Sequence, residues 1–284
     1  TKLYSLQNRK KFYYVLINHN IRANSGSEAK KVKNLLKKFR IKLEIIKNTK
    51  KITKNMQAEA RKIRYGKLIN FCKKKNINTI ITAHNLEDQV ETFFIRLSRG
   101  SGLTGLSSMK TFSKLDKGIY LYRPLLEVEK KYLVKISIKI FKTYFKDPSN
   151  LNKRYLRSKI RNLRGPLKKS GIEYDQIIKS IKNLASSKIT LDEHLKKNIK
   201  EIVTKTRNEV LIDFKKFKKI NYDMKIGVIN EAIRKVKKNY YNPRSKKVVN
   251  LISNFENKKF TKATLGGCVF SKKKDFLSLI IEKS

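Results

Sequence analysis

The first third of the chain alternates between two hydrophobic patterns. Short continuous runs of apolar residues, rich in isoleucine, valine and aromatic side chains, predict buried strands. Between these runs, apolar residues recur every three or four positions, which is the spacing of one helix face. This alternation predicts a Rossmann-like parallel sheet with flanking helices, in the α/β class. We expect strands at residues 12–17, 41–46 and 77–81, and helices at residues 25–39, 55–75 and 86–97.

The helix expected after the third strand carries a concentration of acidic residues. Asn85 can cap its N-terminus, and Glu87, Asp88 and Glu91 share the polar side of its first turns. One interpretation is that these acids only complement the positive end of the helix dipole. The other is a ligand site, because ligands of open α/β sheets bind beyond the carboxyl ends of the strands. Since the whole chain has only 22 acidic residues, we favour a site for a metal-bound ligand that carries phosphate.

Two histidines follow predicted strands directly. His19 comes after the first strand and His84 after the third, so a parallel sheet would bring both to its carboxyl edge. A single histidine is more often structural than catalytic. Two histidines at one edge shift the interpretation towards a site.

The middle of the chain is less regular. Residues 120–126 (YLYRPLL) predict an edge segment, because Pro124 excludes a central strand. A helix is expected at residues 127–141, and residues 147–150 form a turn signal. Gly165-Pro166 then breaks the helical pattern.

The last third predicts a helical connector and a small α+β domain. A long amphipathic stretch at about residues 172–202 is the connector, and short helices and strands follow from about residue 209. Gly266-Gly267 predicts a turn, and Cys268 beside it predicts a buried small apolar side chain. We therefore expect a catalytic domain at residues 1–165, a connector at 166–208 and a basic C-terminal domain at 209–284.

Charge and cysteine content narrow the class of protein. The net charge of +48 points to a polyanionic partner, most simply nucleic acid, although biased coding composition is an alternative source of lysine. Cys72 and Cys268 lie far apart and outside any CxxC pair, which fits a reducing cytosol better than a disulfide framework or a zinc site. No apolar run approaches the roughly 20 residues that span a bilayer, so we expect a cytoplasmic protein without membrane contact.

Clustered arginines are more informative than the lysines. The chain has 15 arginines against 55 lysines, and a planar fork of donors suits phosphate better than a lysine does. A solvated basic face is the alternative. We favour phosphate or RNA binding, because lysine would serve solubility equally well. The clusters are Arg61 with Arg64, Arg96 with Arg99, and the stripe Arg154, Arg157, Arg161 and Arg164.

The segment TAHNLEDQVETFFIRLSRGSGLTGL (residues 82–106) resembles the TAHHxDDQxET…RGSGxxGL signature of the tRNA(Ile)-lysidine synthases. That family belongs to the N-type ATP pyrophosphatase, or PP-loop, superfamily. Further segments resemble family motifs in the same order along nearly the whole chain. They are INHNIRANSGSEA (17–29), NMQAEARKIRY (55–65), YRPLLEV (122–128), DPSNLNKRYLRSKIR (147–161) and TLGGC (264–268).

The resemblance implies an ATP- and Mg²⁺-dependent ligase. Family members adenylate C2 of cytidine-34 in the CAU anticodon of tRNA(Ile), and the amine of L-lysine then displaces AMP to give lysidine. A homodimer is a further possibility. The chemistry requires magnesium held by carboxylate, arginines near phosphate, and charges opposite to those of the lysine substrate.

The resemblance also implies site residues. Asp88, His84, Arg64 and Arg157 are expected at the reacting centre, with Asp88 as the Mg²⁺ ligand. His19, Arg61, Glu91, Arg161 and Asn150 are expected to bind ATP or substrate, with Glu91 orienting the lysine ammonium. Arg154, Arg164 and Arg99 are expected to contact tRNA.

Three departures from the family pattern qualify these expectations. The usual HHxDDQ is HNLEDQ here, so Asn85 and Glu87 are substituted, and the altered reach of Glu87 puts its role in doubt. The family's RNR is replaced by Arg157-Ser158-Lys159. The SGGxDS loop with which the superfamily binds pyrophosphate does not occur, and residues 1–11 resemble the helix that follows that loop. We therefore expect an active parent protein of which this chain lacks the loop.

Two alternatives remain. One is another PP-loop tRNA-modifying enzyme, such as a sulfurtransferase, which generally needs catalytic or cluster-binding cysteines. The other is a non-catalytic RNA-binding protein. A strand followed by SGGxDS upstream of Thr1 would favour the ligase over the second alternative.

We predict that this chain binds ATP weakly, because the loop whose backbone N–H groups would hold pyrophosphate is missing from it. Calorimetric titration with ATP and Mg²⁺ measures the affinity. An affinity typical of ATP-dependent enzymes would contradict the prediction.

Overall fold

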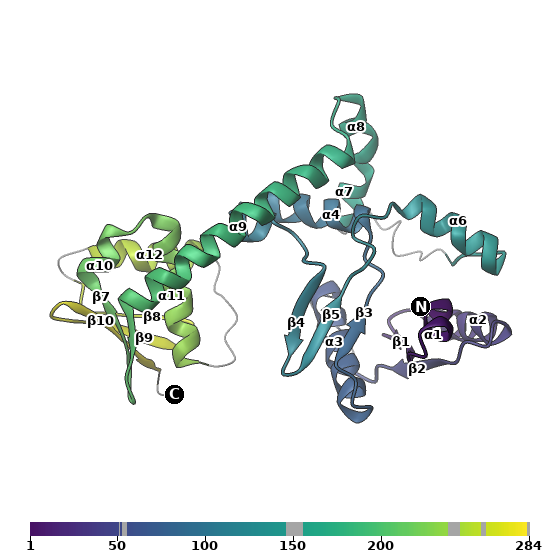
Figure 1. The fold of residues 1–284 in the computed structure, drawn as a ribbon, viewed down its shortest axis with the longest axis horizontal. Coiled ribbons are helices and arrows are strands. Elements are labelled where there is room, and N and C mark those ends of the chain that lie inside the picture. Colours follow the sequence, from purple (N-terminus) through teal and green to yellow (C-terminus); the bar gives the residue numbers. More distant parts are fainter. Residues whose placement is uncertain (51, 53–55, 146–155, 238–244, 257–259, 283–284) are drawn as a thin grey trace. The chain divides into compact units, whose positions relative to one another are not determined.

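The computed structural model describes residues 1–50, 52, 56–145, 156–237, 245–256 and 260–282, and Figure 1 shows its ribbon. The chain folds as two compact units. The first contains Thr1–Ile95 and Ser108–Ile178, and the second contains Arg96–Ser107 and Lys179–Ser284. The division at residue 178 falls inside the predicted connector. The domain boundaries at 165 and 208 stay predictions.

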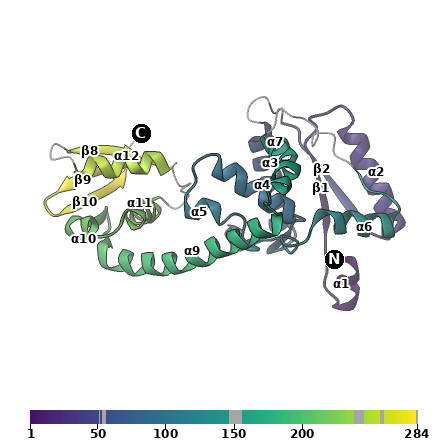
Figure 2. The ribbon, with the colours of Figure 1, turned by 90° about the horizontal axis from the view of Figure 1, so that it is seen from above.

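The first unit begins with a parallel pair of strands. A short helix, α1 (Lys2–Gln7), precedes β1 (Tyr14–Asn18), which pairs in parallel with β2 (Leu43–Lys47). Helix α2 (Ser25–Lys38) joins the two strands and packs on both of them, as Figure 2 shows. The predicted order of strand, helix and strand is confirmed here, with each strand displaced by one or two residues.

A second sheet in the same unit has the order β3-β5-β4. Strand β3 (Thr79–Ile81) runs parallel to β5 (Ile119–Tyr122), and β4 (Phe112–Asp116) pairs with β5 in antiparallel fashion. Ile80, Ile119 and Leu121 form its buried core together with Tyr65 and Cys72 of the preceding helix.

The prediction that residues 120–126 form an edge segment is wrong. Strand β5 lies between β3 and β4, and it ends at Tyr122, before the proline. Pro124 therefore removes no hydrogen bond from the ladder, and Arg123 N still donates to Thr111 O at 2.8 Å. Strand β4 was not predicted, because its sequence FSKLD is short and half polar.

The α/β class is confirmed, but the parallel pairs of the described residues lie in two sheets. Helix α3 (Met56–Lys74) packs against both β1 and β3, although these strands do not pair with each other. The sequence predicted one continuous sheet, because strand order cannot be derived from the alternation alone. Helix α3 is nevertheless a common neighbour of β1 and β3.

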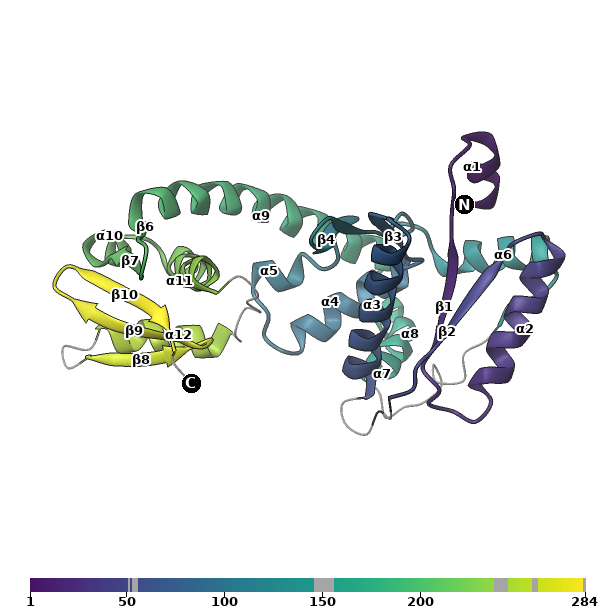
Figure 3. The same ribbon diagram turned by 90° about the horizontal axis from the view of Figure 1, so that it is seen from below.

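Four further helices lie wholly or mostly in the first unit. Helices α2 and α6 lie close together in Figure 3. Phe39 at the end of α2 meets Phe141 at the end of α6 edge to face, at 4.8 Å between ring centroids. The break predicted at Gly165-Pro166 occurs earlier, because Pro166 lies in the first turn of a helix, where its missing N–H costs nothing. The helices are α4 (Leu86–Leu97), α6 (Lys130–Phe141), α7 (Leu156–Asn162) and α8 (Arg164–Lys169).

The second unit contains an antiparallel sheet of order β6-β7-β10-β9-β8. The predicted turn is confirmed, since Gly266 and Gly267 have φ of 66° and 74° between β8 and β9. Cys268 is fully buried, as predicted. The strands are β6 (Val203–Lys205), β7 (Val210–Asp213), β8 (Lys262–Leu265), β9 (Cys268–Lys273) and β10 (Phe276–Ile281).

Helices cover the core of this sheet. Helices α10, α11 and α12 contact its strands, and Leu195 and Ile199 of α9 pack against the same core. No helix in the described ranges is long and apolar enough to cross a membrane. The helices are α5 (Leu103–Leu106), α9 (Tyr174–Ile202), α10 (Phe214–Lys219), α11 (Tyr222–Val236) and α12 (Ser245–Glu256).

We predict that Phe270→Ala destabilises the second unit by about 3–5 kcal/mol, because it empties the centre of this core. Phe270 is 0% exposed, whereas Phe276 in the neighbouring strand is 41% exposed. Phe276→Ala is therefore the matched control, and its cost should be about 1 kcal/mol or less. Urea unfolding measures both, and equal losses would contradict this account of the core.

Candidate functional site

The site is built around the first turns of helix α4. Asn85 Oδ1 accepts a hydrogen bond from Asp88 N at 3.0 Å, and Asp88 Oδ2 accepts one from Asn85 N at 3.1 Å. This reciprocal capping box fixes the start of the helix and the direction of the Asp88 side chain. The second carboxylate oxygen of Asp88 has no partner among the described residues.

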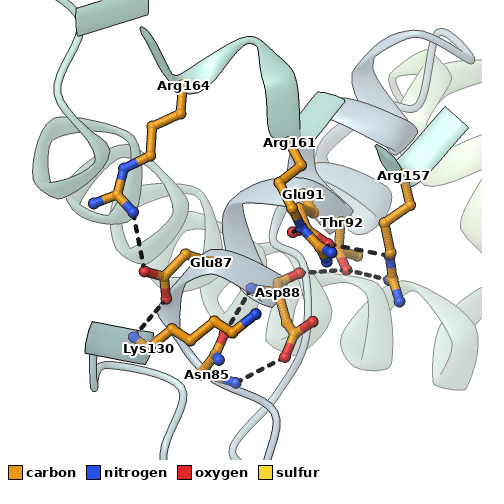
Figure 4. Close-up of polar contacts among 9 residues, drawn as sticks. All are labelled: Asn85, Glu87, Asp88, Glu91, Thr92, Lys130, Arg157, Arg161 and Arg164. Carbon is orange, nitrogen blue, oxygen red and sulfur yellow. Dashed lines mark hydrogen bonds and ion pairs between the residues drawn. The ribbon is translucent and has the colours of Figure 1, made fainter. Parts of the chain in front are cut away.

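Glu91, one turn further along α4, is buried and paired with two arginines of α7. Arg161 Nε and Nη2 lie 2.6 Å and 3.0 Å from its two oxygens, and Arg157 Nε lies at 3.4 Å (Figure 4). The forked contact is the strongest geometry available to a guanidinium and a carboxylate. Burial raises the pKa of Glu91, and the hydrogen bonds from Arg161 oppose that shift.

Glu87 connects α4 to two other helices. Its oxygens accept from Lys130 N, at the start of α6, at 2.9 Å and from Arg164, at the start of α8, at 3.3 Å. Arg164 also lies 3.5 Å from Glu129 and 4.9 Å from the ring centre of Tyr174. The like charges of Glu87 and Glu91, four residues apart, are thus each neutralised by arginine.

His84 and Asp88 lie within a group of cations. Thr82 Oγ1 lies 2.8 Å from His84 Nδ1. Burial, followed by the positive charges of Arg123, Arg61 and Arg157, lowers the pKa of His84 to about 4, although Asp88 acts in the opposite direction. The imidazole is therefore neutral at physiological pH.

His19 belongs to the same neighbourhood through Arg64. Burial and then the charge of Arg64 lower the pKa of His19, and Nδ1 of His19 is buried without a hydrogen bond among the described residues. The pKa of Arg64 is itself lowered by desolvation and by Arg61 and Arg157. Neither Arg61 nor Arg64 has an acidic partner within 4.0 Å in the part of the chain that the structure describes. The site thus has an excess of positive charge.

The structure brings eight of the predicted residues into one neighbourhood, and two of these, Glu91 and Arg161, pair with each other. Arg161, Arg164 and Glu91 are engaged in ion pairs within the protein. Arg99 belongs to the second unit, and Asn150 and Arg154 lie outside the described residues. The other six residues that shared electrostatic contacts join are His19, Arg61, Arg64, His84, Asp88 and Arg157.

Two buried polar residues were missed by the sequence analysis. Gln89 donates to Met109 O at 3.0 Å and accepts from Met109 N at 2.9 Å, and Arg123 donates to Lys110 O at 2.7 Å. Together they hold the segment at which the chain re-enters the first unit. Gln89 follows Leu86 by three residues on the apolar helix face, where an amide requires partners, and this was the available signal.

The ion pairs of Glu91 with Arg161 and of Glu87 with Arg164 limit metal binding, because they occupy carboxylates of the site. The described residues contain no group of three or more His, Cys, Asp or Glu side chains suited to a metal ion. Among the described residues of the cationic neighbourhood, Asp88 is the one that offers an open carboxylate oxygen. That fits Mg²⁺ of the kind that one or two carboxylates and substrate phosphates hold together.

The chain is similar to known proteins over most of its length. A family model described as a PP-loop domain matches residues 1–166. The chain is similar to the tRNA(Ile)-lysidine synthase of Wolbachia sp. subsp. Brugia malayi (strain TRS), with 30% identity over 94% of this chain and 63% of the relative. It is 40% identical to that of Orientia tsutsugamushi (strain Boryong) over 52% of this chain and 33% of the relative. The chain thus spans less than two thirds of the length of these relatives.

A solved structure is similar in fold. It is the U34-tRNA thiolase NcsA from Methanococcus maripaludis with its 4Fe-4S cluster, with a TM-score of 0.52 and 16% identity over 65% of each chain. At this identity the likeness concerns the fold alone.

We predict that Glu91→Gln destabilises the first unit by about 2–3 kcal/mol, because it leaves two guanidinium groups without their counter-charge. This is below the roughly 3–5 kcal/mol of a fully buried pair, since 33% of the Arg161 side chain is exposed. Glu87→Gln is the matched control. Its partner Arg164 is 51% exposed, so the cost should be about 1 kcal/mol or less.

Urea unfolding of Glu91→Gln, Arg161→Gln and the double variant Glu91→Gln/Arg161→Gln measures the coupling between Glu91 and Arg161, and Glu87→Gln is unfolded in the same way as the control. The double variant should lose less than the sum of its single variants. Additive losses would show that the pair does not stabilise helix α7 on α4.

Proposed function

Because the chain belongs to the PP-loop domain family, we propose that the protein is a tRNA(Ile)-lysidine synthase. The reaction uses ATP to adenylate C2 of cytidine-34 in the CAU anticodon of tRNA(Ile), and L-lysine then displaces AMP. The observation that carries the proposal is the cationic neighbourhood around His84 and Asp88, which follows strand β3 and contains one open carboxylate oxygen. The names of the curated relatives support it.

Arginines supply the charge that adenylation requires. Transfer of AMP develops negative charge on phosphate, and donors fixed in advance stabilise that charge. Arg61 and Arg64 have no carboxylate partner among the described residues, so their charge is available to phosphate. Arg157 is a third arginine with charge available to phosphate, because its ion pair with Glu91 is long, at 3.4 Å.

Asp88 is the residue we assign to Mg²⁺. Bound there, Mg²⁺ would neutralise phosphate charge during adenylation. Asp88 keeps one oxygen for its capping hydrogen bond and presents the other. The same carboxylate suits the ammonium group of the lysine substrate at the later step, so its charge serves either ligand.

Glu91 and Arg161 have a positioning role in this proposal. Their forked pair fixes α7 against α4 and thereby directs Arg157 of the same helix, which also lies 3.4 Å from Thr92 Oγ1. The earlier expectation that Glu91 orients lysine is therefore replaced by an indirect role. Arg164 likewise serves first to connect α8 with α4 and α6.

Binding of tRNA rests on charge. The net charge of +48 attracts a polyanion, and Arg99 in the second unit is a candidate contact. A second enzyme class, tRNA thiolation by cysteine, is disfavoured by burial. Cys72 and Cys268 are buried in different units, and desolvation raises the pKa of both thiols, which keeps them protonated and unreactive.

We predict that Asp88→Ala lowers the incorporation of labelled lysine into tRNA(Ile) by at least about 100-fold in the full-length protein, because it removes the open carboxylate. Asp116→Asn is the matched control and should keep full activity, since Asp116 pairs with Lys73 away from this neighbourhood. Full incorporation by Asp88→Ala would refute the site assignment. No incorporation by the unaltered protein would refute the function.

A further inference from the structure

The two ring nitrogens of His84 have different surroundings. Nδ1 lies 2.8 Å from Thr82 Oγ1, whereas Nε2 has no hydrogen-bond partner in the described part of the chain. Thr82 is itself fixed, because its backbone N–H donates to Tyr122 O at 3.0 Å and so extends the pairing of β3 with β5. One end of the imidazole is therefore attached to the sheet, and the other end is open to a ligand.

The hydroxyl of Thr82 indicates which nitrogen carries the proton. A neutral imidazole has one donor and one acceptor nitrogen, and its partner at one nitrogen selects the form. The Thr82 hydroxyl has no other acceptor for its hydrogen among the described residues. If this hydrogen is donated to Nδ1, the ring proton is on Nε2.

The charged groups around His84 agree with that assignment. They are Asp88 on α4, Arg61 on α3, Arg123 after β5 and Arg157 on α7. At His84 itself, three cations against one carboxylate favour an anionic ligand group. Burial and then the three arginines also keep the ring neutral, because they lower the pKa of His84 to about 4 against the opposing charge of Asp88.

Building on the proposed function, we propose that His84 is a neutral hydrogen-bond donor that offers Nε2–H to a phosphate oxygen of the nucleotide, and that Thr82 is the residue that sets this form of the ring. His84 then contacts the reacting phosphate without carrying a proton between groups. Thr82 acts only through His84 and is a positioning residue. Neutral imidazoles serve as donors to substrate oxygen in other enzymes by the same principle.

The proton position can be measured directly in this chain. It has only three histidines, His19, His84 and His194, so long-range ¹H–¹⁵N spectra of the imidazoles are simple, and His84→Gln identifies the signals of His84. We expect the Nε2–H form, unchanged between about pH 8 and about pH 6. An Nδ1–H form, which would make Nε2 an acceptor suited to an ammonium, overturns the proposal, as does protonation in that range.

Variants of Thr82 test the positioning role by the same spectra. Thr82→Ser keeps the hydroxyl and should keep the Nε2–H form. Thr82→Val has a similar shape without the hydroxyl, and the ring should become a mixture of both forms. An unchanged spectrum in Thr82→Val would show that another group sets the proton position.

Substitutions of His84 test the donor in catalysis. The side-chain amide of glutamine can place an N–H near the position of Nε2, whereas that of asparagine reaches only the position of Nδ1. We expect His84→Gln to keep lysine incorporation within about 10-fold, and His84→Asn and His84→Ala to lose about 100-fold or more. If Gln is as inactive as Ala, the donor role is wrong.

The two proposals fail separately. The spectra report the proton position in the 284-residue chain whatever reaction its parent catalyses. Absence of lysine incorporation in the unaltered full-length protein would refute the ligase function and leave the spectra unaffected. Normal incorporation with an Nδ1–H ring would refute only the role of His84.

Discussion

A carboxylate that has lost its water is stable only where cations and hydrogen-bond donors replace that water. In this protein Glu91 is 1% exposed, and the replacement comes from Arg161 and Arg157 on a helix some 70 positions later in the chain. The ion pair therefore joins two segments that the backbone does not connect locally. This ion pair holds helix α7, and with it Arg157, near His84. Without it, the cationic neighbourhood would lose the charge of Arg157.

Much of the secondary structure could be predicted from hydrophobic periodicity. The strands before His19 and His84 and the helices α2, α3 and α4 follow the pattern closely. The middle strand β5 was misassigned, because Pro124 was counted within the strand that ends at Tyr122. The pairing order was not predictable either, since periodicity shows that a segment is a strand but not which strand lies beside it.

The sequence offered candidates for the site but not the contacts among them. The resemblance to the tRNA(Ile)-lysidine synthase motifs implied that His84, Asp88 and the arginines belong together. It could not show that Arg161 takes both oxygens of Glu91, because pairing over such a sequence distance depends on tertiary packing. Gln89 was overlooked because its partners are the backbone N–H and C=O of Met109. Every residue carries these backbone groups, so the type of the partner residue gave no signal.

The segment Arg96–Ser107 belongs to the second unit although the chain on either side of it belongs to the first. The chain therefore passes between the units at three places, near residues 95, 107 and 178. A single cut cannot divide the protein into its two units, and no contiguous fragment contains one unit whole without a piece of the other. A fragment of residues 1–178, for example, contains the whole first unit together with the segment Arg96–Ser107 of the second. The interleaved order of the two units therefore ties the expression of either whole unit to that of part of its neighbour.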